Sequence, residues 1–246
     1  TGEVLPSDQT FSGFIFKIHA NIDPKHRDRI AFLRICSGRF ERQKKYLHVR
    51  SGKTFRSVNP TAFMAQEKSI IETAYPGDII GLHDTGNLKI GDTLTEGEQF
   101  EFKGIPSFSP EIFKYVINED PLKTKKLEKG LHHLCEEGVA QLFTLKLNGR
   151  KIIGTVGMLQ FDVIKYRLEH EYGAKCSYEN VNIKKACWID TSNSNNEQLK
   201  SLINYKSKFI AKDKDNKIVF LADSEFTLIN TKHKYEGLIF HEKSEF

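Results

Sequence analysis

The sequence predicts a small antiparallel β-barrel followed by an α+β domain of ferredoxin-like order, β-α-β-β-α-β, with a C-terminal extension. Three features of the 246-residue chain lead to this prediction. Short β-branched and aromatic runs separated by turn residues fill positions 11–102, which is typical of a barrel. Two prolines and two serines interrupt that rhythm at 104–110. After this break, strand patterns alternate with two amphipathic helix patterns.

The first domain is placed at residues 1–104 and is expected to contain only short strands. Its runs of Phe, Ile, Leu and Val end at turn pairs such as Ser37-Gly38 and Ser51-Gly52. No long helix pattern interrupts these runs. The main expected strands cover residues 11–18, 29–36, 46–50 and 79–82.

The second domain is placed at residues 105–246 and opens with a strand over 111–117. Asp120-Pro121 then provides a helix N-cap and a proline at the first helical position. Four apolar residues follow at the spacing of one helical face, namely Leu127, Leu131, Leu134 and Cys135. Gly138 is expected to end this helix, because glycine readily adopts the left-handed conformation that closes helices.

A hairpin and a second helix continue the pattern of this domain. The hairpin covers 139–156 and turns at Asn148-Gly149. A helix over 158–172 places Phe161, Ile164, Leu168 and Tyr172 on one face, and Gly173 ends it. A strand near 175–178 completes β-α-β-β-α-β.

The remainder of the second domain is treated as the C-terminal extension. Residues 191–196 form an Asn- and Ser-rich loop. Two helices and one strand are expected after it, over 197–205, 225–233 and 217–222 respectively. No internal repeat is evident in the sequence.

The composition bounds the class of protein. The chain is 39% hydrophobic with 18 Phe and 8 Tyr, which is sufficient for folded cores. No apolar run approaches the ~20 residues needed to cross a bilayer, and the start resembles no signal peptide. Its four cysteines are far apart and predict buried thiols in a reducing cytoplasm, without a disulfide or metal site. The first residue is not Met, so we expect a piece of a longer protein.

Motifs for catalysis are weak. Ser51-Gly-Lys-Thr54 resembles the end of a phosphate-binding loop, but Leu47 stands where that loop needs its first glycine. The adjacent His132 and His133 face different sides of a helix and do not match a zinc motif. Asp162 has no second carboxylate or nucleophile at a recognisable spacing. The sequence therefore predicts no catalytic, cofactor or metal site in this chain.

The charge is distributed unevenly. Residues 24–56 contain eleven Lys and Arg against two acidic residues, a local charge of +9 in a chain of net charge +5. Such a segment is typical of contact with the phosphates of a nucleic acid, which Arg and Lys bind without reading sequence. A solvated sheet edge that charge protects from aggregation is the structural alternative.

Several strings along the chain resemble one family. Phe11-Ser-Gly-Phe-Ile-Phe-Lys-Ile18, Asp23-Pro-Lys-His-Arg-Asp-Arg29 and Ala74-Tyr-Pro-Gly-Asp78 are similar to the barrel domain of bacterial peptide chain release factor 3. Gly104-Ile-Pro-Ser-Phe-Ser-Pro110 and Leu159-Gln-Phe-Asp-Val163 are similar to its third domain. The resemblance covers nearly the whole chain. The family's first domain, which binds and hydrolyses GTP with Mg²⁺, has no counterpart here.

The resemblance implies a function in translation termination. It implies a cytoplasmic GTPase, without membrane contact, that promotes departure of the codon-reading release factors from the ribosome. These two domains would dock on the RNA and protein of the small subunit and contact the protein's own GTPase domain. The candidate RNA contacts are Lys25, His26, Arg27, Arg29, Arg39 and Arg42.

Two alternatives remain at this stage. Another translational GTPase, of elongation or ribosomal-protection type, shares the barrel and continues into further domains. A free-standing RNA-binding module would explain the basic segment alone. A metabolic enzyme is the weakest option because the sequence holds no catalytic set.

Overall fold

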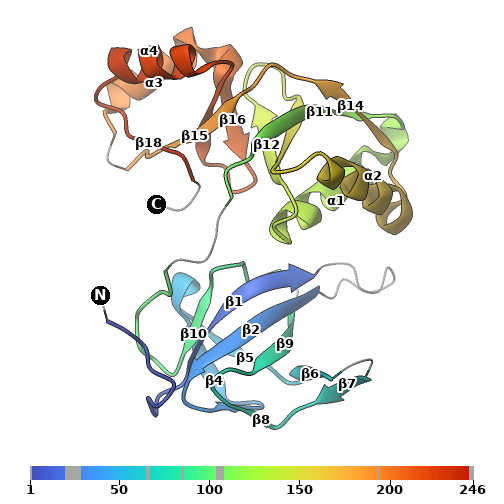
Figure 1. The fold of residues 1–246 in the computed structure, drawn as a ribbon, viewed down its shortest axis with the longest axis vertical. Helices are drawn as coiled ribbons and strands as arrows, with labels where there is room; N and C mark the ends of the chain where they lie inside the picture. The colour runs from blue at the N-terminus through green and yellow to red at the C-terminus, as the bar shows by residue number, and fades with distance from the viewer. Residues whose placement is uncertain are drawn as a thin grey trace. The chain divides into compact units, whose positions relative to one another are not determined.

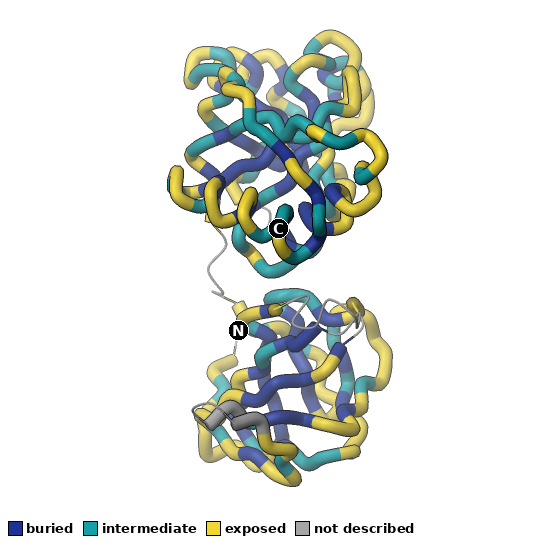
Figure 2. Tube along the Cα trace, turned by 90° about the vertical axis from the view of Figure 1, so that its right-hand side faces the viewer, coloured by how far each residue is buried: buried dark blue, intermediate teal, exposed yellow. Residues whose placement is uncertain are grey.

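The computed structural model describes residues 2–19, 29–64, 67–84, 86–103, 108–192 and 194–243 (Figure 1). The chain forms two compact units, one of Thr1–Ile105 with Glu136–Gly138 and the other of Pro106–Cys135 with Val139–Phe246. In both units the buried residues gather on the strands, and the exposed residues lie mainly in turns and on outer helix faces (Figure 2). Each unit is described by itself.

The first unit is built on one eight-stranded antiparallel sheet of order β5-β4-β10-β1-β2-β9-β6-β7. Two short strands, β3 and β8, pair separately, and a 3-10 turn, η1 (Val49–Ser51), connects β4 to β5. The strands are β1 (Ser12–His19), β2 (Arg29–Ser37), β3 (Phe40–Glu41), β4 (Lys45–His48), β5 (Lys53–Arg56), β6 (Thr61–Met64), β7 (Glu67–Ile70), β8 (Thr73–Ala74), β9 (Ile79–Asp84) and β10 (Thr93–Thr95).

This sheet curls around a single apolar core. Register shifts between β1 and β2 mark bulges, which bend a strand and increase its twist. Phe11, Phe40 and Tyr46 pack inside the curl, with ring centroids 4.4 to 5.8 Å apart. Gly38, at φ +63°, is required there because a Cβ would lie 2.5 Å from the Phe11 nitrogen. The predicted antiparallel β domain is confirmed, as a curled sheet whose described pairs run from β5 to β7.

The second unit also has one eight-stranded antiparallel sheet, of order β14-β11-β13-β12-β16-β17-β15-β18. Within its described residues, four helices and two 3-10 turns accompany the sheet. The elements are β11 (Ile112–Asn118), η2 (Pro121–Lys123), α1 (Thr124–Glu136), β12 (Gln141–Leu145), β13 (Lys151–Thr155), α2 (Leu159–Tyr172), β14 (Cys176–Asn180), β15 (Lys185–Ile189), α3 (Asn196–Tyr205), η3 (Ser207–Phe209), β16 (Ile210–Asp213), β17 (Ile218–Ala222), α4 (Glu225–Lys234) and β18 (Phe240–His241).

The first half of this sheet confirms the predicted β-α-β-β-α-β order. The Asp120 side chain accepts a hydrogen bond from the Leu122 nitrogen and caps the helical segment, as the sequence indicates. Gly173 ends α2 at φ 64°. The helices α1 and α2 approach closely at Gly130, where a Cβ would lie 2.5 Å from the Leu168 side chain.

The second half corrects the expectation of an extension without repeats. Its elements β15-α3-β16-β17-α4-β18 repeat the order of the first half, and its strands occupy equivalent places in the sheet. The two halves join where β12 pairs with β16, with Thr144 opposite Lys212. Leu228, Thr231 and Tyr235 are buried in and after α4 at the spacing of Phe161, Ile164 and Leu168 in α2. The C-terminal segment is therefore a second ferredoxin-like repeat.

The two halves also share a core whose fully buried residues all lie on strands. The helices α1 and α2 cover one half and α3 and α4 cover the other (Figure 1). A separate cluster on the opposite faces includes Phe113, Phe143, Ile152, Trp188 and Val219. Strands such as β13 and β17 are thus buried on both faces, which explains their nearly continuous apolar sequences.

Two further expectations concern cysteines and membranes. All four cysteines are free thiols; Cys135, Cys176 and Cys187 are buried and Cys36 is half-buried. Within the described ranges no helix combines the length and the apolar character that crossing a membrane requires.

Candidate nucleic-acid interface

The basic segment of the sequence is only partly described by the structure. Lys25, His26 and Arg27 lie outside the described residues. The other basic residues of the segment lie on β2, in the turns before and after β3, and on the β4–β5 hairpin. Their surroundings divide them into two groups, those held by carboxylates and carbonyls of the first unit and those that face solvent.

Arg29, one of the predicted RNA contacts, belongs to the first group. Its guanidinium donates from Nε to Asp84 Oδ2 at 3.3 Å and from Nη2 to the Leu88 carbonyl at 2.7 Å. Asp84 also accepts from the backbone nitrogens of Gly86, Asn87 and Leu88. Arg29 is buried at the start of β2 and its charge is neutralised inside the unit. It stabilises the segment after β9, and its burial does not favour the predicted RNA contact.

Arg39 and Arg42 follow the turn after β2 and differ in availability. The exposed Arg39 lies 3.2 Å from Glu41 Oε1, and the hydrogen bond to Glu41 raises the pKa of the guanidinium. Arg42 is half-buried and donates to the Val58 carbonyl at 2.6 Å and to Glu72 Oε1 at 2.7 Å. Arg39 is therefore accessible to an anion, whereas Arg42 acts mainly as a local clamp.

The β4–β5 hairpin carries an accessible pair of basic residues that the sequence analysis did not single out. Lys45 and Arg56 lie directly opposite each other in the register and both are exposed. Arg56 donates to Gln43 Oε1 at 3.1 Å, an uncharged partner. Like charges directly opposite on a sheet repel, so a bound phosphate would stabilise this pair. The sequence shows which side chains of each strand alternate between the two faces of the sheet. It does not show that Lys45 pairs with Arg56, because the turn between β4 and β5 sets that register.

A hydrogen-bonded network holds the hairpin itself in place. Arg50 contacts both carboxylate oxygens of Asp92, at 2.5 and 2.8 Å. His48 Nε2 lies 2.7 Å from Asp92 Oδ2, and its Nδ1 lies 2.9 Å from Ser51 Oγ. The order of contacts Ser51–His48–Asp92 is that of a nucleophilic triad. However, Arg50 binds the Asp92 carboxylate, and Ser51 Oγ accepts a hydrogen bond from the Lys53 nitrogen at 3.3 Å, so these groups have structural partners. This network fixes the turn.

The segment Ser51-Gly-Lys-Thr54 covers the end of that turn and the start of β5. It connects two antiparallel strands through η1, with Gly52 at φ 65°. A phosphate-binding loop connects a strand to a helix and presents successive backbone nitrogens to the phosphates. The local geometry is that of a hairpin.

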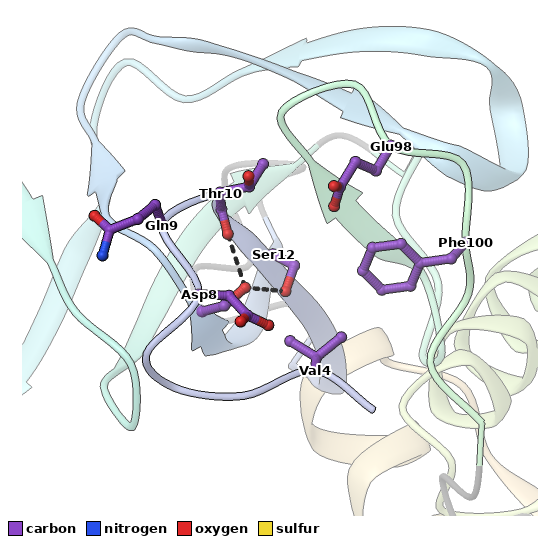
Figure 3. A pocket seen from close by; sticks show the side chains of 8 residues that line it. Val4, Asp8, Gln9, Thr10, Ser12, Glu98 and Phe100 are labelled. Carbon is purple, nitrogen blue, oxygen red and sulfur yellow. Dashed lines mark hydrogen bonds between the residues drawn. The ribbon is translucent and has the colours of Figure 1, made fainter. Parts of the chain in front are cut away.

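A pocket of about 260 Å³ opens elsewhere on the first unit (Figure 3). It is lined by Val4, Asp8, Gln9, Thr10, Ser12, Ser37, Glu98 and Phe100. Ser37 Oγ donates to the Thr10 carbonyl at 2.8 Å, so Ser12 Oγ must donate to Ser37 Oγ across their 2.6 Å contact. Ser12 therefore offers only acceptor capacity to the pocket, beside two carboxylates. Phosphate does not fit such a lining.

The described residues contain no group of three His, Cys, Asp or Glu side chains that would hold a metal ion. The arrangement in the first unit is a set of exposed cations on an antiparallel sheet, among them Arg39, Lys45 and Arg56.

Both units match models of known protein families. Residues 10–97 match the family model of elongation factor G domain 2. Residues 102–232, more than half of the chain, match the model of the class II release factor RF3 C-terminal domain.

A crystal structure of a protein from Thermus thermophilus has a similar fold, with a TM-score of 0.61 and 22% sequence identity. The match covers 74% of this chain and 28% of the solved chain, so this chain spans less than a third of that protein's length. The combination of a barrel-type second domain of an elongation factor with the release-factor module is that of a translational GTPase. The chain belongs to the family of class II release factor RF3.

Proposed function

We propose that this chain docks a translation-termination GTPase on the small ribosomal subunit and supports GTP-dependent dissociation of the codon-reading release factors. Family membership is the observation that carries this proposal, because the release-factor module covers most of the second unit. In the complete protein, GTP or GDP and Mg²⁺ would bind in a separate GTPase domain. The protein would act in the cytoplasm without a membrane partner.

The first unit supplies the RNA contact in this proposal. Arg39, Lys45 and Arg56 present exposed positive charge on described strands and turns. Lys25, His26 and Arg27 would extend this surface from the segment outside the described residues. Contacts of this type position a protein on nucleic acid through phosphates, and their affinity falls steeply with salt.

Two alternative functions remain open to test. The match of residues 10–97 to an elongation factor domain fits another translational GTPase equally well for the first unit. The match of the second unit to the release-factor model favours termination. A free-standing RNA-binding module is less well supported, because both units match domains of multidomain translation factors.

The test is co-sedimentation of the chain with ribosomes over a salt series. We expect binding that weakens with salt and that falls in the variant Lys45→Gln/Arg56→Gln and in Lys25→Ala/Arg27→Ala. The variant Lys125→Gln/Lys126→Gln removes two exposed lysines of α1 and is the matched control. Equal loss in the control, or no binding at low salt by a folded chain, would contradict docking through this surface.

Termination is tested with the complete protein. We expect it to accelerate release-factor dissociation from ribosomes after peptide release, in the presence of GTP. Acceleration of tRNA translocation instead would assign the protein to the elongation type.

A further inference from the structure

The ends of α3 and α4 form a cluster of lysines around an exposed tyrosine. The two helices lie side by side on the second repeat (Figure 1). The Tyr205 side chain is 79% exposed at the end of α3. Lys234, the last residue of α4, places its Nζ 5.9 Å from the Tyr205 ring centroid. Two elements distant in the sequence therefore meet at this ring.

Two more lysines and a second ring continue the cluster. Lys208 Nζ lies 4.6 Å from the centroid of Phe209, and Lys206 Nζ lies 5.7 Å from the same centroid. Phe209 is half-buried in η3, directly after α3. Within the described chain, none of these three lysines forms an ion pair with a carboxylate. Each of the three ammonium groups thus lies within 6 Å of an aromatic ring centroid, at cation–π range.

Helix geometry explains part of this arrangement. Lysines at helix C-termini are favourable because the last carbonyls carry partial negative charge. That effect accounts for Lys206 and Lys234 but not for an almost fully exposed tyrosine beside them. Exposed aromatic rings flanked by cations are the combination with which proteins bind single-stranded nucleic acid, since bases stack on the rings and phosphates contact the cations.

We propose that Tyr205, Lys206, Lys208, Phe209 and Lys234 form a binding site for single-stranded RNA. A base would stack on Tyr205, and the ammonium groups would contact the phosphates on either side of it. An acidic peptide would use the same lysines but has no base to stack, so the exposed ring favours RNA. This site adds a second RNA contact to the proposed function. It rests on that function only for the identity of the RNA, which would be an unpaired segment of ribosomal RNA.

Binding of a fluorescein-labelled oligouridylate to the whole chain, followed by fluorescence anisotropy, tests the site. The starting protein carries Lys45→Gln/Arg56→Gln, so that the first unit contributes little. We expect Tyr205→Leu to weaken binding by about tenfold and Tyr205→Phe to retain it, because phenylalanine keeps the stacking surface. We expect Lys206→Gln/Lys208→Gln/Lys234→Gln to weaken binding and to lower the salt slope by about two, at ~0.7 per phosphate.

The control removes three exposed lysines of α1 in Lys125→Gln/Lys126→Gln/Lys129→Gln. Equal weakening by this control would show charge attraction without a site and would overturn the proposal. Unchanged binding in Tyr205→Leu would overturn the proposal. Polyglutamate that displaces the oligonucleotide equally well from the starting protein and from its Tyr205→Leu variant would overturn it in favour of an acidic partner. The probe is an isolated oligonucleotide and not a ribosome. A negative result with it therefore leaves the proposed ribosome docking by the first unit untouched, and a negative ribosome-binding result leaves this RNA site untouched.

Discussion

The Trp188 ring on β15 packs against the Phe143 ring on β12, with 5.9 Å between their centroids. In the hydrogen-bonded order β16 and β17 separate these two strands. The contact therefore forms across the faces of the two repeats that the helices leave uncovered. It shows that the second repeat completes the core of the first and is no appendage to it.

The first prediction concerns this shared core. Phe143→Ala removes a fully buried ring and should lower the free energy of unfolding by about 3–5 kcal/mol. Trp188 is the one tryptophan in the chain, so its fluorescence reports on the same core in a urea titration. Phe226→Ala is the control, because that ring is 74% exposed and should change stability by less than about 0.5 kcal/mol. Equal effects of the two substitutions would contradict a core shared by the repeats.

The close approach of α1 and α2 gives a second prediction. Gly130→Ala should destabilise the chain by about 1–3 kcal/mol, because its Cβ would meet the side chains of Leu168 and Tyr172 at 2.5 and 2.9 Å. Alanine is the better helix former by about 1 kcal/mol, so the propensity alone predicts the opposite sign. Urea denaturation decides between them, with the exposed Lys129→Ala on the same helix as the control.

The hairpin network leads to a third prediction. Asp92→Asn should cost about 2 kcal/mol, because the carboxylate accepts charge-assisted hydrogen bonds from Arg50 and a backbone bond from Lys89. Thermal unfolding of the variant measures the loss. If Asp92→Asn unfolds like the wild-type protein, the network does not hold the hairpin.

Much of the fold was predictable because local signals agree with tertiary structure. In α2 the spacing of Phe161, Ile164 and Leu168 and the terminal Gly173 predict the helix, its buried face and its end. The expected helices over 197–205 and 225–233 and the strand over 217–222 are confirmed as α3, α4 and β17.

The second repeat could not be recognised from the sequence for two reasons. Thr231 occupies the buried position that corresponds to Ile164, which hides the likeness of the two helices. The connecting strand β16 has four residues and β18 has two, and both are defined only by pairing with distant partners.

The candidate site was predicted less well than the fold. The basic character of residues 24–56 is plain in the sequence, but whether an arginine on a strand faces inward depends on its distant partner. Arg29 faces Asp84, and Lys45 faces Arg56 only because the β4–β5 turn sets that register. Lys25, His26 and Arg27 stay a prediction.

A fourth prediction concerns alkaline pH. Burial raises the pKa of Tyr178 above its usual range, and its hydroxyl donates to the Phe161 carbonyl at 3.2 Å. The folded state therefore holds this proton more tightly than the unfolded state, in which the pKa is about 10. The stabilisation is complete below pH ~10 and is lost as pH rises, by up to about 1.4 kcal/mol per pH unit. Urea midpoints across this range should fall less steeply in Tyr178→Phe, whereas the exposed Tyr205→Phe should follow the wild-type curve.

The most direct test of the central claim is binding of the chain to isolated small and large ribosomal subunits, compared in one salt series. We predict salt-sensitive binding to the small subunit that weakens in Lys45→Gln/Arg56→Gln and persists in Lys125→Gln/Lys126→Gln. Binding to the large subunit alone, or equal binding to both with no difference between the two variants, would contradict docking of this chain on the small subunit.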